Sequence, residues 1–364
     1  MRVRQKIVVL PGDGIGPEVV REAIKVLEEV KRLLQLELDI EEKKAGGAAL
    51  DEAGEPLPPE TLAACREASA VLHGAFGGPR WDDYPLNKKP LSALLNLRKE
   101  LDVYANLRFA RPFSSLLNKA PLKNEYLEDV DLVLVREVTS GVYFGPKERR
   151  SYGKSFIATD TMYYSDFEIE RVARRAFDIA RKRYKKVTCA DKANVLETSR
   201  LWRKILREVQ KDYSDVELEF MYVDNCAMQL VLNPREFDVL LTSNIFGDIL
   251  SDEASAVLVG SVGVLPSATL GEEGQTSLFG PIHGAINEIA GQNTANPLGT
   301  ILSAALLLRY SLQEEGGASA IEKAVELVLE EGYRSKELMT PGMTQVSTAE
   351  MGDRVVEKLQ NLVI

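Results

Sequence analysis

The sequence predicts an α/β protein with a largely parallel central sheet flanked by helices. Short runs rich in Val, Ile and Leu alternate along the chain with longer segments of helical periodicity. This alternation is the pattern of βαβ units, in which parallel strands are joined by helices. A length of 364 residues allows two domains or one large α/β unit.

The elements follow from the position of the apolar runs and the turn residues between them. The first strand is expected in KIVVLPG, and the first helix over residues 17–34, where Pro17 and Glu18 are ordinary helix-start signals. Further strands are predicted at 36–45, 70–78, 131–138, 185–190, 218–223 and 237–243. Further helices are predicted near 58–68 and at 165–184, 198–213, 296–312 and 317–333.

Composition excludes several classes of function. A formal charge of −10 argues against nucleic acid as a partner, because phosphate binding needs clustered cationic surface. No apolar run is long enough to span a bilayer, and the chain starts directly with a strand, so no membrane association and a cytoplasmic location are expected. Three scattered cysteines without a C-x-x-C pair fit a reducing compartment.

The glycine-rich segment LPGDGIGPE lies at a strand end and a helix start. Its glycines are Gly12, Gly14 and Gly16, so it matches neither the G-x-G-x-x-G dinucleotide fingerprint nor a phosphate loop with Gly-Lys-Ser/Thr. From this loop alone, a binding role and a structural role are equally good interpretations.

Three arginines lie in or beside apolar segments: Arg98, Arg108 and Arg136. A buried arginine must find an anion, because it keeps its proton and its unpaired burial is costly. Guanidinium groups pair with carboxylates through two parallel hydrogen bonds, so three converging arginines suit a substrate with two carboxylates. Taken separately, each is more often a surface or salt-bridge residue.

Four polar residues follow predicted strands or turns. Tyr143 lies in the glycine-flanked turn SGVYFGP and Lys192 directly after a strand, where burial or a neighbouring cation can adapt each to proton transfer. Asp224 is expected to end the strand FMYVDNCA, at the edge where α/β sites form. His283 lies in a loop rich in Gly, Asn and Pro that suits a flat ligand, and with no Cys or second His nearby zinc is rejected.

Asp248 and Asp252 stand four residues apart in NIFGDILSDEAS. On a helix this spacing places both carboxylates on one face, where they repel each other unless a positive group lies between them. A solvated acidic face is the ordinary alternative.

Several motifs, in chain order, resemble the isocitrate/isopropylmalate dehydrogenase family of β-decarboxylating dehydrogenases. They are LPGDGIGPE, LLNLRKELDVYANLR, VREVTSGVYFG, DKANVLETSRLWRK, YVDNCAMQL and NIFGDILSDEAS. The resemblance covers essentially the whole chain and is closest to the isopropylmalate branch. It implies a homodimer with shared active sites and two discontinuous domains: a cofactor-binding domain of residues 1–103 and 260–364, and a substrate, metal and dimerisation domain of residues 104–259.

The resemblance also implies roles for single residues. Tyr143 and Lys192 would move protons, and Asp248 and Asp252 would hold Mg²⁺ or Mn²⁺ together with Asp224 from the partner chain. The residues expected to contact a 3-alkylmalate substrate are Arg98, Arg108, Arg136, Asp224, Leu94 and Leu95. The residues expected to bind NAD are Ile15, His283, Gly284, Glu288 and Asn296, with the acid at Glu288 favouring NAD⁺ over NADP⁺.

The sequence departs from the family pattern at three places. Gly280 replaces a glutamate, Ala285–Asn287 differ from the usual Ser-Ala-Pro, and Leu91 replaces a glutamate near the nicotinamide and the substrate's alkyl group. The last change makes the pocket more apolar. It is compatible with drifted contacts, with a bulkier substrate such as benzylmalate, or with lower activity or looser NAD⁺ binding.

The resemblance therefore implies NAD-dependent oxidative decarboxylation of 3-isopropylmalate in leucine biosynthesis. The alternatives within the family are homoisocitrate, isocitrate and D-malate, and Leu94 and Leu95 argue against isocitrate because its extra carboxylate needs a polar partner. A catalytically inactive regulatory subunit is the non-enzyme alternative. The presence of all predicted metal and proton-transfer residues argues against it.

Overall fold

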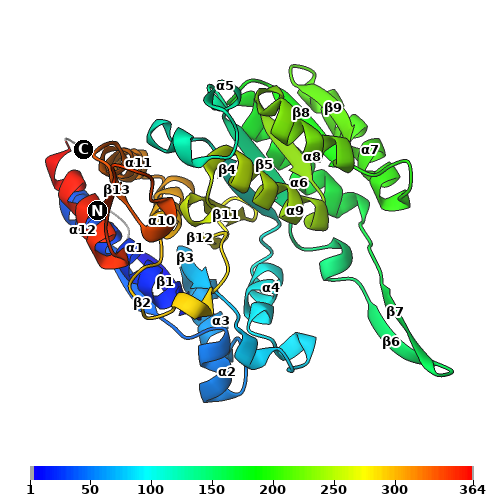
Figure 1. Cartoon of the computed structure of the whole chain (residues 1–364). Helices are drawn as coiled ribbons and strands as arrows, with labels where there is room; N and C mark the ends of the chain where they lie inside the picture. The colour runs from blue at the N-terminus through cyan, green and yellow to red at the C-terminus, as the bar shows by residue number, and fades with distance from the viewer. Residues whose placement is uncertain (1–3, 363–364) are drawn as a thin grey trace. The chain divides into compact units, whose positions relative to one another are not determined.

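The computed structural model describes residues 4–362, which divide into two compact units (Figure 1). Unit 1 comprises the chain up to Val103, Pro112–Pro121 and the chain from Val259 onward. Unit 2 comprises Tyr104–Arg111 and Leu122–Leu258. The predicted domain boundaries differ from these units mainly at Pro112–Pro121, which belongs with unit 1 because the Arg334 guanidinium donates a 2.7 Å hydrogen bond to the Ser115 carbonyl.

Unit 1 contains strands that run parallel to their neighbours except in one pair. Its strands lie in the order β2 (Leu38–Glu42), β1 (Gln5–Gly12), β3 (Ala70–Ala75), β12 (Ser277–Pro281) and β11 (Pro266–Leu270). Only the β11–β12 pair is antiparallel among these neighbours. Every residue of β3 is buried, as expected for a central strand covered on both faces.

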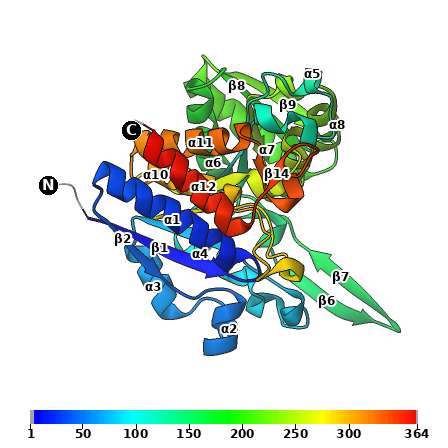
Figure 2. The ribbon, with the colours of Figure 1, turned by 60° about the vertical axis from the view of Figure 1, so that its left-hand side comes forward.

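The helices of unit 1 are α1 (Gly16–Leu34), α2 (Gly47–Ala53), α3 (Pro59–Glu67), α4 (Leu91–Glu100), α10 (Leu298–Tyr310), α11 (Glu315–Glu330) and α12 (Thr348–Asn361). Figure 2 shows α1 beside α12, and α10 packs on α1 and α11. Helix α10 is apolar on all sides and buried from Leu298 to Leu308, so it forms the centre of this layer. A small pair, β13 (Tyr333–Arg334) with β14 (Thr344–Gln345), precedes α12.

The strands of unit 2 follow a similar pattern. Its strands lie in the order β4 (Ala105–Ala110), β5 (Leu132–Glu137), β10 (Val239–Thr242), β8 (Lys186–Asp191) and β9 (Glu217–Tyr222), and only β4–β5 is antiparallel among these neighbours. Its helices are α5 (Asn124–Leu127), α6 (Asp166–Arg181), α7 (Glu197–Gln210), α8 (Val223–Leu232) and α9 (Asn244–Ala254). A long hairpin of β6 (Lys147–Tyr152) and β7 (Ser155–Asp160) extends from this unit (Figure 1).

The predicted α/β class is confirmed, and the predicted strands and helices are present with boundaries shifted by a few residues. One placement is wrong: β9 ends at Tyr222, and Asp224 lies in the first turn of α8 rather than at the end of the strand. An acid is favourable there because the amide groups at a helix N-terminus are unpaired. Among the described residues, no helix has the length and apolar content needed to cross a bilayer.

Candidate functional site

Unit 2 brings two of the three predicted arginines together. Arg108 on β4 and Arg136 on β5 come from antiparallel neighbours, and the two residues are 8 % and 2 % exposed. Both contact the carboxylate of Asp248: Arg136 through Nη1, and Arg108 through Nη2 at 3.3 Å. Arg108 Nη1 also lies 3.1 Å from Asp252 Oδ1. Asp248 and Asp252 therefore share one face of α9, and Arg108 lies between them.

Helix α9 can lie close to β5 because residue 247 is glycine. A Cβ atom there would lie 2.2 Å from Thr242 Oγ1 and 2.7 Å from Arg136 Cγ. Any side chain would therefore displace the helix that carries the two acids. This close approach explains the glycine of NIFGD.

Burial changes the pKa values of this cluster. Desolvation, assisted by the neighbouring Arg136, lowers the pKa of Arg108 to about 10, so its guanidinium stays charged at neutral pH. Desolvation raises the pKa of Asp252, and the charge of Arg108 opposes that rise. The charge of Arg108 thus limits the cost of burying the Asp252 carboxylate.

Tyr143 joins the same cluster from the short turn Gly141–Tyr143. Its hydroxyl donates to Asp248 Oδ2, and the Arg136 guanidinium lies over its ring, 5.2 Å from the centroid. Burial and the hydrogen bond to Asp248 raise the pKa of the phenol. Tyr143 is therefore protonated at neutral pH, and the raised pKa makes its phenol a weaker acid than a free tyrosine.

Lys192 and Asp224 form a separate pair in unit 2. Lys192 Nζ lies 2.6 Å from Asp224 Oδ1, and the Asp224 side chain is 67 % exposed. The hydrogen bond from Lys192 lowers the pKa of Asp224. No three His, Cys, Asp or Glu side chains within residues 4–362 gather into a possible metal site, so Asp224 does not join Asp248 and Asp252 within one chain.

The remaining predicted substrate residues lie on α4 in unit 1. Leu91, Leu94, Leu95 and Arg98 follow the i, i+3, i+4, i+7 spacing of one helix face. Leu94 and Leu95 are partly buried, and Arg98 is buried. Their joint action with the residues of unit 2 stays a prediction.

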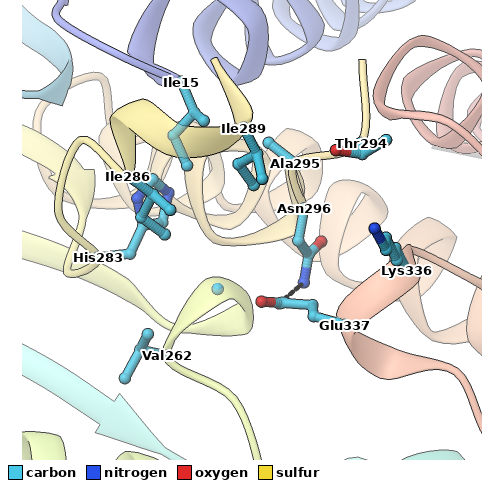
Figure 3. A pocket seen from close by; sticks show the side chains of 11 residues that line it. Ile15, Val262, His283, Ile286, Ile289, Thr294, Ala295, Asn296, Lys336 and Glu337 are labelled. Atoms are coloured by element: carbon cyan, nitrogen blue, oxygen red, sulfur yellow. Dashed lines mark hydrogen bonds between the residues drawn. The ribbon is translucent and has the colours of Figure 1, made fainter. Parts of the chain in front are cut away.

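A cavity of about 320 Å³ in unit 1 contains three of the five predicted cofactor residues, Ile15, His283 and Asn296 (Figure 3). Gly284 and Glu288 do not line it, and Glu288 is exposed. The GDGIG loop forms one wall by packing directly on the loop that carries His283 and Ala285. Ile15 donates a 2.8 Å backbone hydrogen bond to Ala285, and a Cβ on Gly14 would lie 2.0 Å from the Ala285 carbonyl oxygen.

The polar groups of this cavity are few and oriented. His283 Nδ1 lies 2.9 Å from the Gly284 carbonyl, so Nδ1 carries the proton and Nε2 is an acceptor. Burial lowers the pKa of His283 and keeps the ring neutral. His283 Nε2 and Thr294 Oγ1 are buried side-chain atoms of the lining with no hydrogen-bond partner in the described structure. The cavity thus offers unused polar positions to a ligand.

Sequence reasoning missed several residues of this cavity. Glu337 accepts a 2.8 Å hydrogen bond from Asn296 Nδ2 and one from Ser261, and Lys336 lies beside it (Figure 3). The other missed lining residues are Val262, Gly263, Ile286, Ile289, Thr294 and Ala295. Glu337 and Lys336 lie in a short segment without periodicity, which gives no signal that it folds back on the glycine loop.

The departure at Gly280 has a steric cause. A Cβ atom at this position would lie 2.3 Å from Cε1 of His73 on the neighbouring strand β3. His73 is buried, and its Nδ1 lies 2.7 Å from the Gly74 carbonyl. No side chain fits at position 280 while this ring keeps its place.

Known proteins resemble this chain over nearly its whole length. The family model described as isocitrate/isopropylmalate dehydrogenase matches residues 6–355. The 3-isopropylmalate dehydrogenase of Moorella thermoacetica is 54% identical over 98% of this chain and 99% of its own length, and that of Aquifex aeolicus is 49% identical over 99% and 98%.

Solved structures show the same fold. The isocitrate dehydrogenase of Methylococcus capsulatus superposes with a TM-score of 0.87 at 36% identity, covering 98% of this chain and 99% of that one. A β-decarboxylating dehydrogenase from Thermococcus kodakarensis, in its apo form, gives a TM-score of 0.79 at 34% identity, covering 98% and 96%.

Proposed function

Because the chain belongs to the isocitrate/isopropylmalate dehydrogenase family, we propose that it catalyses the NAD-dependent oxidative decarboxylation of (2R,3S)-3-isopropylmalate to 4-methyl-2-oxopentanoate and CO₂ in leucine biosynthesis. The observation that carries the proposal is the cluster of Arg108, Arg136 and Tyr143 around the two acids of α9. The near-full-length identity to proteins named 3-isopropylmalate dehydrogenase supports this substrate over isocitrate.

Substrate binding is assigned to the arginines. Arg108 and Arg136 present buried, fixed guanidinium groups, which suit carboxylates because they form paired, charge-assisted hydrogen bonds. Arg98 is the third proposed carboxylate ligand. Leu94 and Leu95 provide apolar surface on α4 for the alkyl group of the substrate.

The acids of α9 fit a hard divalent cation. Mg²⁺ and Mn²⁺ prefer carboxylate and water oxygens, and Asp248 and Asp252 supply two carboxylates one helical turn apart. A metal ion there would lower the pKa of the substrate hydroxyl and stabilise negative charge on its oxygen. The third carboxylate is proposed to be Asp224 from a second copy of the chain, in agreement with its separation from the α9 acids within one chain.

Two side chains are proposed to move protons. In its neutral amine form, Lys192 accepts the proton of the C2 hydroxyl, directly or through water, while a hydride leaves C2 for NAD⁺. After loss of the C3 carboxylate, Tyr143 donates its phenolic proton to C3. The raised pKa of Tyr143 keeps the phenol protonated at neutral pH before this step.

The adenine end of NAD is proposed to bind in the cavity of unit 1. Its walls combine apolar residues such as Ile15 and Ile289 with the unpartnered His283 Nε2, which can accept a hydrogen bond from an amino group. When bound, NAD⁺ supplies the hydride acceptor. Glu288, although outside this cavity, is proposed to pair with the ribose hydroxyls and to disfavour a 2′-phosphate.

A homodimer is proposed on the basis of the β6–β7 hairpin. Both strands are exposed over nearly their whole length, including Tyr152 at 68 % and Phe156 at 66 %. A two-stranded hairpin alone is marginally stable in water and exposes unpaired edges, so a second copy of the chain is the partner it suits. A cytoplasmic enzyme of a biosynthetic pathway fits this proposal.

One observation favours a second candidate substrate class. Leu91 is 47 % exposed at the start of α4, on the face that carries Leu94 and Leu95. It extends the apolar surface by one helical turn. A malate with a bulkier 3-substituent, such as benzylmalate, would use this surface.

A substrate panel tests the proposal. Turnover is measured with NAD⁺ or NADP⁺, with Mg²⁺ or Mn²⁺, against 3-isopropylmalate, benzylmalate, homoisocitrate, isocitrate and D-malate. The highest kcat/KM is expected for 3-isopropylmalate with NAD⁺. A preference for isocitrate, or full activity after exhaustive chelation, would contradict the proposal.

A further inference from the structure

Each arginine of the unit 2 cluster is held along one edge by a buried asparagine. Arg136 donates to Asn244 Oδ1 from Nε at 3.1 Å and from Nη2 at 2.7 Å. Arg108 donates to Asn106 Oδ1 from Nε at 3.0 Å. Asn244 is fully buried and Asn106 is 1 % exposed. The same arrangement, an amide oxygen on the inner edge of a guanidinium, therefore occurs twice in one site.

The fold brings these amides to the arginines from both sides. Asn106 lies two residues before Arg108, on the same face of β4, and directly opposite Arg136 in the β4–β5 register. Asn244 is the first residue of α9, one turn before Asp248 on the same face. These amides are thus built into the elements that carry the charged residues.

The orientation of the Asn244 amide is fixed. Its Nδ2 donates a 2.9 Å hydrogen bond to the Ser140 carbonyl, and its backbone N–H donates to the Tyr164 hydroxyl at 2.9 Å. Turning the amide over would place its NH₂ group against the guanidinium donors of Arg136 and its oxygen against a carbonyl. Asn244 therefore links Arg136 to the turn that leads to Tyr143.

A neutral amide acceptor leaves the charge of the arginines available for the substrate, whereas a carboxylate acceptor would not. Arg108 and Arg136 already face the two carboxylates of α9. A further acid on their inner edges would cancel their remaining attraction for a dianionic substrate, because charges interact strongly at this distance in a buried site. An amide oxygen satisfies the inner N–H groups and leaves the positive charge unchanged.

We propose that Asn106 and Asn244 are positioning residues for substrate binding, whose neutral amide oxygens orient Arg108 and Arg136 while preserving their charge for the carboxylates of the substrate. The inference rests on the proposed function in assigning a diacid substrate to these arginines. It assigns a role to two residues that do not themselves contact the reacting atoms.

The test compares Asp and Leu at each position. Asn106→Asp and Asn244→Asp keep the shape and the acceptor but add a charge, whereas Asn106→Leu and Asn244→Leu remove the acceptor without adding charge. Dissociation constants for D-malate with Mg²⁺ are measured by calorimetry, and KM for NAD⁺ is measured in parallel. Each Asp variant is expected to bind D-malate about tenfold or more weakly, and more weakly than its Leu counterpart, with an unchanged KM for NAD⁺.

Thermal unfolding separates this role from a structural one. A purely structural role predicts that Asp, the closer mimic, is the milder change in both stability and affinity. The proposal predicts opposite orders: Leu is the more destabilising change, and Asp the more damaging one for D-malate. Asn233→Asp, at an exposed position of unit 2, is the matched charge control and should bind D-malate as the unaltered protein does.

The outcomes distinguish this inference from the proposed function. D-malate carries the two carboxylates common to all candidate substrates. Two results would overturn the inference. One is that the Asp variants bind D-malate within twofold of the unaltered protein. The other is that the Leu variants bind D-malate no more tightly than their Asp counterparts. Absence of 3-isopropylmalate turnover together with the expected order for D-malate would overturn the substrate assignment alone, and absence of D-malate binding by the unaltered protein would overturn both.

Discussion

Replacing Gly280 by alanine tests the close packing of β12 against His73. The new Cβ would lie 2.3 Å from His73 Cε1, whereas ordinary contacts begin near 3.4 Å, so the ring would have to move by about 1 Å. The ring cannot move without losing the 2.7 Å contact of its Nδ1 with the Gly74 carbonyl. Overpacking of this kind costs ~1–3 kcal/mol of the free energy of unfolding.

A double-mutant cycle assigns that cost to His73. His73→Ala removes the ring and leaves a cavity, at a cost of ~1–3 kcal/mol. Gly280→Ala in the His73→Ala background should then cost less than about 0.5 kcal/mol, which gives a coupling energy of ~1–2 kcal/mol between the two sites. The free energies come from guanidinium denaturation of the four proteins. Equal costs of Gly280→Ala in both backgrounds would refute the steric explanation of this departure from the family.

Three further predictions concern the site and its surroundings. Asp248→Asn should lower kcat/KM for 3-isopropylmalate by about 10²-fold or more, since it removes a proposed metal ligand, and added Mg²⁺ should rescue it only partly; unchanged kinetics would exclude Asp248 from the site. Lys192→Met should abolish turnover while calorimetry still detects binding of D-malate with Mg²⁺, and retained turnover would remove Lys192 from proton transfer. Burial raises the pKa of Glu137 to about 7 despite hydrogen bonds from Thr139 and Ser140. Because the folded state holds this proton more tightly than the unfolded state, its contribution to stability is full below about pH 4.5 and falls as pH rises to about 7. Unfolding free energies of the unaltered protein and of Glu137→Gln across this range should show a smaller decline in the variant, and parallel curves would contradict the assignment.

Local sequence signals predicted most of the regular structure. Helices such as α6 and strands such as β5 carry strong periodicity or continuous apolar runs and were predicted. The helix α12 and the strands β4, β11 and β12 were not. The hairpin β6–β7 gave no such signal, because both its strands are exposed, β6 is mostly polar, and the apolar residues of β7 are consecutive rather than alternating. Asp224 was misplaced because YVDNCA reads as a continuous strand, although the helix begins at Val223.

The site residues that could be predicted are those whose spacing along the sequence indicates a shared helix face. Asp248 and Asp252 stand one helical turn apart, and both contact Arg108 as that spacing requires. Glu337 was not predictable, since only the tertiary fold brings it to Asn296. The role of Asn244 was hidden for a similar reason: an asparagine in a helical motif is compatible with many contacts, and only the position of Arg136 selects one.

The cavity of unit 1 joins residues from opposite ends of the chain, Ile15 near the start and Glu337 near the end. Strand β3 likewise pairs with β12, which follows it by about two hundred residues. On the ribosome, the first hundred residues must therefore wait for the last hundred before their sheet can be completed. The middle of the chain, which holds the strands β5, β8, β9 and β10, can begin to fold during that delay. Pauses in translation after this middle region should therefore lower the yield of folded protein less than pauses within it.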